Sequence, residues 1–129
     1  MAKNPKIHTV TCKYVNGTDG DGSTSATTAL ADSGKIPMGA SILRATVLTK
    51  VAIAGAGGGL LLYAEGTDGS GSVLVSTYAV GDTNAIGDVA AGAVTGATIT
   101  EESDFAIKMV SAVATAGDLT FVIEYIMGN

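Results

Sequence analysis

His8 and Cys12 are the only histidine and the only cysteine in the chain, which makes them the first candidates for nucleophilic chemistry. A cysteine beside a histidine can act as a nucleophile that the histidine activates. The residues around this pair alternate as in a β-strand, where residues four apart lie roughly 13 Å from each other. That distance is too long to share a proton, and a zinc site needs three or four ligands. We therefore expect Cys12 in the core and His8 near a strand end or against a neighbour.

Asp19 and Asp21 lie in the polar segment TDGDGS, which is similar to part of a calcium-binding loop. Calcium needs six to eight oxygen ligands, and its helical loop motif adds further acidic or amide ligands and a distal glutamate. This segment has no such additions. The related segment EGTDGSGS contains Asp68 with no paired acid at all. We interpret both segments as Asp-Gly turns rather than metal sites.

Glu101, Glu102 and Asp104 form the one acidic cluster of the sequence. Paired carboxylates can work as acid and base, but this cluster lies in a polar loop before a strand, which favours solvated charge. The glycine-rich run at 55–59 is not followed by the lysine, hydroxyl residue and helix of a phosphate loop. An interface ion pair and simple solubility explain Arg44 equally well. We expect no catalytic, cofactor-binding or metal-binding residues, and hence no enzyme.

Composition excludes several classes of partner. Twelve acidic residues against seven Lys and Arg give a net charge of −5, and a single arginine is a poor basis for binding phosphates, so we expect no nucleic-acid partner. One cysteine allows no intrachain disulfide, and no apolar stretch is long enough to span a membrane as a helix. No signal peptide opens the sequence, so we expect synthesis in a cytoplasm. The four tyrosines do not cluster as a sugar-stacking platform in the sequence, although the fold could bring some together.

Hydrophobic alternation with a period of two predicts strands along most of the chain. The clearest segments are Ile7–Val15, Ser41–Ile53, Leu60–Ala64, Val73–Val80, Phe105–Val113 and Leu119–Met127. In the second of these, Leu43, Ala45, Val47, Val51 and Ile53 are expected on one buried face. We expect one hairpin between the third and fourth segments, and a second hairpin between the last two.

The sequence therefore predicts an all-β fold of about seven or eight short antiparallel strands without a convincing helix. Turn signals recur roughly every ten residues, as in a β-sandwich, a jelly roll or a small barrel. We expect a jelly-roll-like β-sandwich, although an immunoglobulin-like sandwich would give the same pattern. Residues 1–7 are expected to form an N-terminal arm, and residues 8–129 one β-sandwich domain.

Apolar residues also occupy strand positions that should face away from the core. These are Ile42, Leu48, Val110, Val122 and Ile126. Large exposed apolar patches usually mark contacts between proteins. The pattern indicates a subunit interface, with loop cover as the alternative for some of these positions.

Two segments resemble a known family. KIPMGASILRATV, at Lys35–Val47, resembles the turn and long strand of many small bacteriophage virion proteins. VATAGDLTFVIEYI, at Val113–Ile126, resembles their closing hairpin. The proteins in question are capsid decoration (cement), head-fibre and related minor structural proteins. The resemblance implies a β-sandwich subunit, often trimeric, and supplies no catalytic residue.

The expected function is that of a capsid decoration (cement) protein. Such a protein would be made in the cytoplasm of the bacterial host and would bind the major capsid protein on the capsid exterior as a homo-oligomer, expected to be a trimer. The arm at residues 1–7, with Lys3 and Lys6, is the expected docking element. The alternatives are another virion component, such as a head fibre, tail or baseplate part, and a carbohydrate-binding module.

Overall fold

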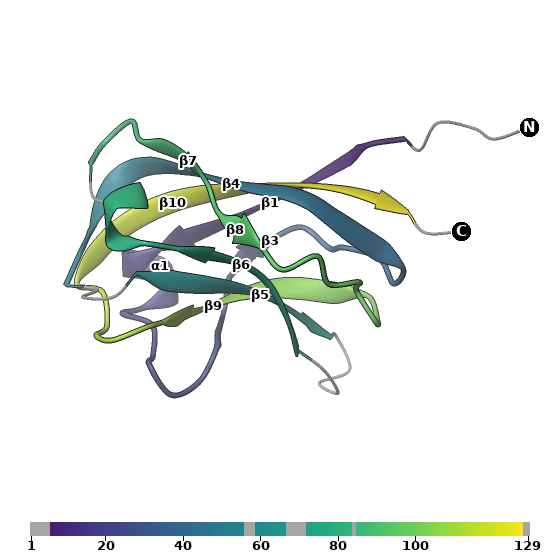
Figure 1. The fold of residues 1–129 in the computed structure, drawn as a ribbon. Coiled ribbons are helices and arrows are strands. Elements are labelled where there is room, and N and C mark those ends of the chain that lie inside the picture. The colour runs from purple at the N-terminus through teal and green to yellow at the C-terminus, as the bar shows by residue number, and fades with distance from the viewer. Residues whose placement is uncertain (1–5, 56–58, 67–71, 84, 128–129) are drawn as a thin grey trace, which may run out of the picture.

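Two antiparallel five-stranded sheets pack face to face in the computed structural model, which describes residues 6–55, 59–66, 72–83 and 85–127 (Figure 1). Sheet A contains, in spatial order, β3 (Asp32–Ser33), β1 (His8–Val15), β10 (Ala116–Met127), β4 (Ala40–Ala54) and β7 (Val89–Ala91). Sheet B contains β2 (Thr28–Ala29), β9 (Ser103–Met109), β5 (Leu60–Gly66), β6 (Ser72–Tyr78) and β8 (Ala93–Val94). The fold is thus the all-β sandwich expected from the sequence.

The strand order identifies the sandwich as a jelly roll. With the outermost strands β3 and β8 left aside, sheet A runs β1-β10-β4-β7 and sheet B runs β2-β9-β5-β6. The chain therefore crosses repeatedly between the sheets, and its first and last long strands pair side by side within sheet A. Eight strands in two such sheets are the jelly-roll arrangement.

The core lies between the sheets and consists mainly of aliphatic residues with a few aromatic rings. Along β10, buried and partly exposed residues alternate over the whole strand, which puts Leu119, Phe121 and Ile123 fully inside. Phe121 meets Tyr78 of the opposite sheet at a ring-centroid distance of 5.5 Å. Full burial of an aliphatic or aromatic side chain contributes about 1.5–3 kcal/mol. The inward faces of the long strands therefore hold the two sheets together.

Two irregularities in β4 make the expected assignment of its faces wrong in part. Tyr125 pairs with Ile42 but Glu124 pairs with Arg44, so an extra residue at position 43 turns Ile42 inward and leaves Leu43 44% exposed. A second shift, near Lys50, leaves Val51 45% exposed. A β-bulge adds one residue to one strand and so reverses the faces beyond it.

The hairpin expected between the last two strands does not form. β9 belongs to sheet B, where it pairs with β5 and β2, whereas β10 belongs to sheet A. Residues 110–115 carry the chain from one sheet to the other. In this crossing, the Thr115 amide donates to the Ala54 carbonyl of β4 at 2.7 Å. The other expected hairpin is confirmed, because β5 and β6 pair along their length.

The polar segment after β1 differs from a simple loop. Asn16–Asp19 forms one turn of α-helix, α1, and Gly20 ends it with a φ of +83°. A second short turn, the 3-10 helix η1 (Val80–Asp82), follows β6. Both turns connect strands and neither covers a sheet.

Candidate interaction surface

Cys12 and His8 have structural positions rather than catalytic ones. Cys12 is fully buried, and burial, with a smaller contribution from Asp32, raises the pKa of its thiol far above the ordinary range. The thiol therefore stays protonated and is a poor nucleophile. His8 is the first residue of β1, and its ring stacks on Tyr125 at 5.3 Å with an interplanar angle of 20°. Both residues thus lie where the sequence predicted.

Asp19 and Asp21 accept hydrogen bonds within their own loop region. The Asp19 carboxylate accepts from the backbone amides of Val15 at 2.8 Å and Ala31 at 2.9 Å, which ties the helical turn to two other segments. The Asp21 carboxylate accepts from the Asn16 side-chain amide at 2.9 Å. No group of three His, Cys, Asp or Glu residues in the described parts of the chain could hold a metal ion. Asp68 lies outside the described residues.

The acidic cluster lies at one end of sheet B. Asp104 forms an ion pair with Lys35 at 3.0 Å, and both side chains are about half exposed. In the ladder between β9 and β5, Asp104 lies opposite Glu65. The Glu65 carboxylate accepts a hydrogen bond from the Thr27 hydroxyl. These are solvent-accessible carboxylates with structural partners, as expected for solvated charge. Of the glycine-rich run, residues 56–58 lie outside the described residues.

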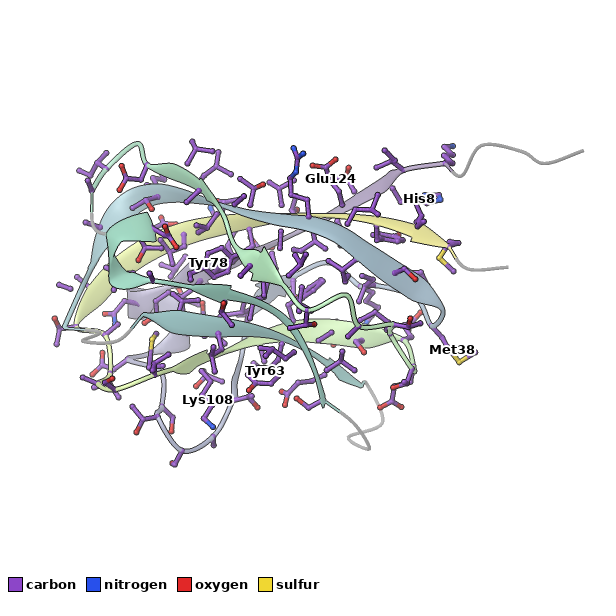
Figure 2. All side chains as sticks on the ribbon, in the orientation of Figure 1. His8, Met38, Tyr63, Tyr78, Lys108 and Glu124 are labelled. Atoms are coloured by element: carbon purple, nitrogen blue, oxygen red, sulfur yellow. The ribbon has the colours of Figure 1, made fainter. Side chains whose placement is uncertain are left out.

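The tyrosines do not form a binding platform. Tyr14, Tyr78 and Tyr125 are buried between the sheets, whereas Tyr63 is half-buried on the outer face of sheet B. Figure 2 shows Tyr78 between the sheets and Tyr63 on the outer side of β5. The Tyr78 hydroxyl donates to the Ala45 carbonyl of the opposite sheet at 3.0 Å. Because three of the four rings belong to the core, they cannot stack on a sugar.

The outer face of sheet A carries mostly neutral residues. Cross-strand partners that point outward form two rows across the sheet, Lys13–Thr120–Leu48–Val89 and Thr11–Val122–Thr46–Ala91. A third pair, Arg44 and Glu124, lies 3.9 Å apart on the same face. Of the five apolar residues expected to face outward, Leu48 and Val110 are exposed and Val122 and Ile126 are half-buried. Ile42 is only 6% exposed, because the bulge turns it into the core.

A groove of about 420 Å³ opens on this face beside β7. Leu48, Ile86 and Val89 supply its apolar lining, and Lys50, Asp88 and Thr120 are also part of its wall. Ile86 is 76% exposed and Val89 67% exposed. The sequence pattern did not single out these two residues, because residues 81–96 show no regular alternation.

A second apolar region lies at the end of sheet A where β1 begins and β10 ends; we call it the terminal surface. Its exposed side chains are Ile7 (56%), Met38 (66%), Leu43 (44%) and Met127 (39%). Met127 pairs with Ala40, beside the turn that carries Met38, and His8 pairs with Tyr125. Figure 2 shows His8 and Met38 at this same end of the molecule. The proline-containing turn at 37–39 was the available sequence signal for Met38.

No protein-family model matches the chain, and no curated protein sequence matches it. Solved structures do match its fold. A chain of the cyanophage Pam1 capsid asymmetric unit matches with a TM-score of 0.62 and 15% identity, over 99% of this chain and 89% of that chain. A chain of the Ralstonia phage GP4 capsid matches with a TM-score of 0.61 and 12% identity, over 100% and 90% of the two chains. A chain of the acid-stable capsid of Helicobacter pylori bacteriophage KHP30 gives 0.55 and 9%, over 95% and 89%.

These chains are of similar length to this one, because nearly all of 129 residues makes up about nine-tenths of each. The similarity therefore extends over the whole sandwich. Within the described residues, no helix is long and apolar enough to cross a membrane. At these identities the similarity establishes the fold.

Proposed function

We propose that this protein is a structural component of a bacteriophage virion, and specifically a capsid decoration (cement) protein. The observation that carries the proposal is the match over nearly the whole chain to chains of similar length in three phage capsid structures. The resemblance of Lys35–Val47 and Val113–Ile126 to small virion proteins points to the same class.

The surface chemistry supports a structural role. Threonine and aliphatic residues make up most of the two rows on the outer face of sheet A, and exposed apolar side chains line both the groove and the terminal surface. Surfaces of this kind favour contact with other proteins. The candidate chemical groups, Cys12, Asp19 and Asp21, are instead engaged in the core or in loop hydrogen bonds.

The proposed assembly is a homotrimer that binds the major capsid protein on the outside of the head. Its mechanism is additive: each bound trimer bridges neighbouring capsid subunits, and many copies together raise the free-energy cost of opening the shell under genome pressure. Burial of apolar side chains at each contact supplies the stabilisation, less the entropy lost on association. The contact requires no covalent chemistry and no cofactor.

Residues 1–7 are the proposed docking arm, with Lys3 and Lys6 as its cations. Residues 1–5 lie outside the described part of the chain, and Lys6 and Ile7 are exposed. Deleting residues 1–7 should abolish capsid binding and leave the domain folded, as measured by co-sedimentation and circular dichroism. Full capsid binding by the truncated protein would contradict the proposed role of residues 1–7 in docking.

The first experiment is the oligomeric mass by light scattering, followed by co-sedimentation with mature capsids. A trimer that binds at one trimer per local three-fold axis supports decoration. A monomer that does not bind capsids would overturn both the trimer and the decoration function. Binding at a few copies per particle would instead favour a head fibre, tail or baseplate component.

A further inference from the structure

β1 is an edge strand that is only partly covered. On one side it pairs with β10 over all eight residues, from His8 to Val15. On the other side it pairs with β3 only at Cys12 and Lys13, and the Thr11 carbonyl accepts from the Gly34 amide at 2.9 Å. The first part of the strand therefore has one open side, which faces away from β10.

The direction of its backbone groups follows from this hydrogen bond. In an antiparallel ladder, the N–H and C=O of one residue point to the same side and those of the next residue to the other side. Because the Thr11 carbonyl points toward β3, the N–H and C=O of Thr9 point toward the open side as well. Among the described residues these two Thr9 groups have no hydrogen-bond partner.

The other outermost strands have far fewer backbone groups with which an added strand could pair. β7 is three residues long, and β2 and β8 are two residues long each. Short edge strands are one way in which proteins prevent unwanted pairing. β1 is longer than each of these strands, and its first four residues, His8–Thr11, have no paired residue in β3.

The open edge adjoins the terminal surface, where Ile7 and Met127 are exposed. Lys6 is exposed in line with the edge, whereas Glu124, the cross-strand neighbour of Thr9, forms an ion pair with Arg44. This end of the protein thus presents apolar side chains and the exposed cation of Lys6, although the chain as a whole has a net charge of −5. An occupant with apolar side chains and an acidic residue at one end would match both features.

We propose that the open edge of β1, at residues 7–10, receives an extended strand of the major capsid protein by β-strand addition. Main-chain hydrogen bonds to Thr9 supply part of the affinity, and the terminal surface contacts the apolar side chains of the added strand. The inference rests on the proposed function, since it identifies how the decoration protein holds its shell partner. An acidic residue at one end of the capsid strand forms an ion pair with Lys6.

The test uses Thr9→Pro in the full-length protein. Proline removes the outward N–H of Thr9 and leaves the ladder bonds of His8 and Val10 to β10 in place, because those residues point the other way. Proline is also tolerated on edge strands. Two controls are matched to it. Thr9→Ala removes the side chain and keeps the N–H, and Val94→Pro removes an outward N–H from β8 of sheet B, where the Thr95 amide donates toward β6.

Binding is measured by co-sedimentation with capsids that lack the protein, after circular dichroism and thermal melts establish that each variant is folded. We expect Thr9→Pro to bind at least tenfold more weakly, and both controls to bind like the wild type. Wild-type binding by folded Thr9→Pro would overturn the edge contact. An unfolded Thr9→Pro would move the test to Thr9→N-methylthreonine, made by chemical ligation, with the same two outcomes.

Two further outcomes separate this inference from the proposed function. If the wild-type protein does not bind capsids, both fail together. If Thr9→Pro binds capsids normally but light scattering shows a smaller oligomer than the wild type, the edge accepts a second copy of this chain instead. That result would overturn the capsid strand as the occupant and leave the decoration function in place.

Discussion

At the scale of single residues, the Tyr78 hydroxyl links the two sheets through the core. It donates to the Ala45 carbonyl at 3.0 Å and lies 3.1 Å from the Ser76 hydroxyl, which is fully buried. Tyr78→Phe leaves the Ser76 hydroxyl without this partner, and leaving a buried polar group unsatisfied costs about 1–3 kcal/mol. Urea unfolding should show that loss, whereas the control Tyr63→Phe, on the outer face of sheet B, should change stability by less than about 0.5 kcal/mol. Equal effects of the two substitutions would contradict the assigned role of Tyr78.

Two buried groups that lose a proton at alkaline pH, the Cys12 thiol and the Tyr78 hydroxyl, make the protein less stable as the pH rises. Burial raises the pKa of both Cys12 and Tyr78, with hydrogen bonding from Ser76 acting in the opposite direction on Tyr78. The folded state therefore holds these protons more tightly than the unfolded state does. The contribution of these two protons to the free energy of unfolding is fully present below the pKa of an unfolded cysteine thiol, about 8.5. It falls as the pH rises through that value and through the pKa of an unfolded tyrosine, about 10. Free energies of unfolding measured from pH 8 to 11 should decline, and a flat profile would disprove the assignment.

At the scale of elements, glycines allow the close approach of β5 and β6. Gly59, just before β5, has a φ of +89°, and a Cβ there would lie 2.1 Å from the Tyr78 backbone carbonyl oxygen. Backbone cannot yield as a flexible side chain can, and the positive φ adds strain of about 1–3 kcal/mol. We expect Gly59→Ala to lower the free energy of unfolding by about 2 kcal/mol or more. Gly17→Ala is the control, because a Cβ at Gly17 meets nothing within 4 Å, and an equal loss there would exclude this explanation.

β4 shows how an element can depart from its sequence pattern. Its apolar residues predicted one regular buried face, and Ala45 and Val47 do lie there. Leu43 and Val51 lie outside instead, because the partner strand β10 has fewer residues over the same length of ladder. The pairing between two strands, rather than the alternation within one, decides where a bulge occurs.

At the scale of the whole molecule, the chain ends must meet before sheet A is complete. β1 pairs with β10 from one end of the ladder to the other, and β10 in turn pairs with β4. Such non-local pairing gives slow folding, in about milliseconds to seconds for all-β domains. Stopped-flow refolding followed by tyrosine fluorescence should show this range, since the chain has no tryptophan. Refolding in microseconds would be incompatible with this topology.

The sequence by itself determined the all-β class and the inward face of β10, because a period of two is a local property of a strand. It also identified Cys12 as a core residue, since a lone thiol within an alternating strand has no reactive partner nearby. Asp19 and Asp21 were recognised as residues of a connecting segment, but the helical turn that contains Asp19 was not predicted.

Only the tertiary structure decided which strands are neighbours. Phe105 and Phe121 both have the pattern of buried strand residues, and the sequence suggested a hairpin between their strands, yet these belong to opposite sheets. The same holds for the terminal surface, and for the open edge at Thr9, which exists because β3 pairs with only two of the eight residues of β1. Strand pairing joins residues far apart in the chain, so its free energy depends on contacts that no local pattern records.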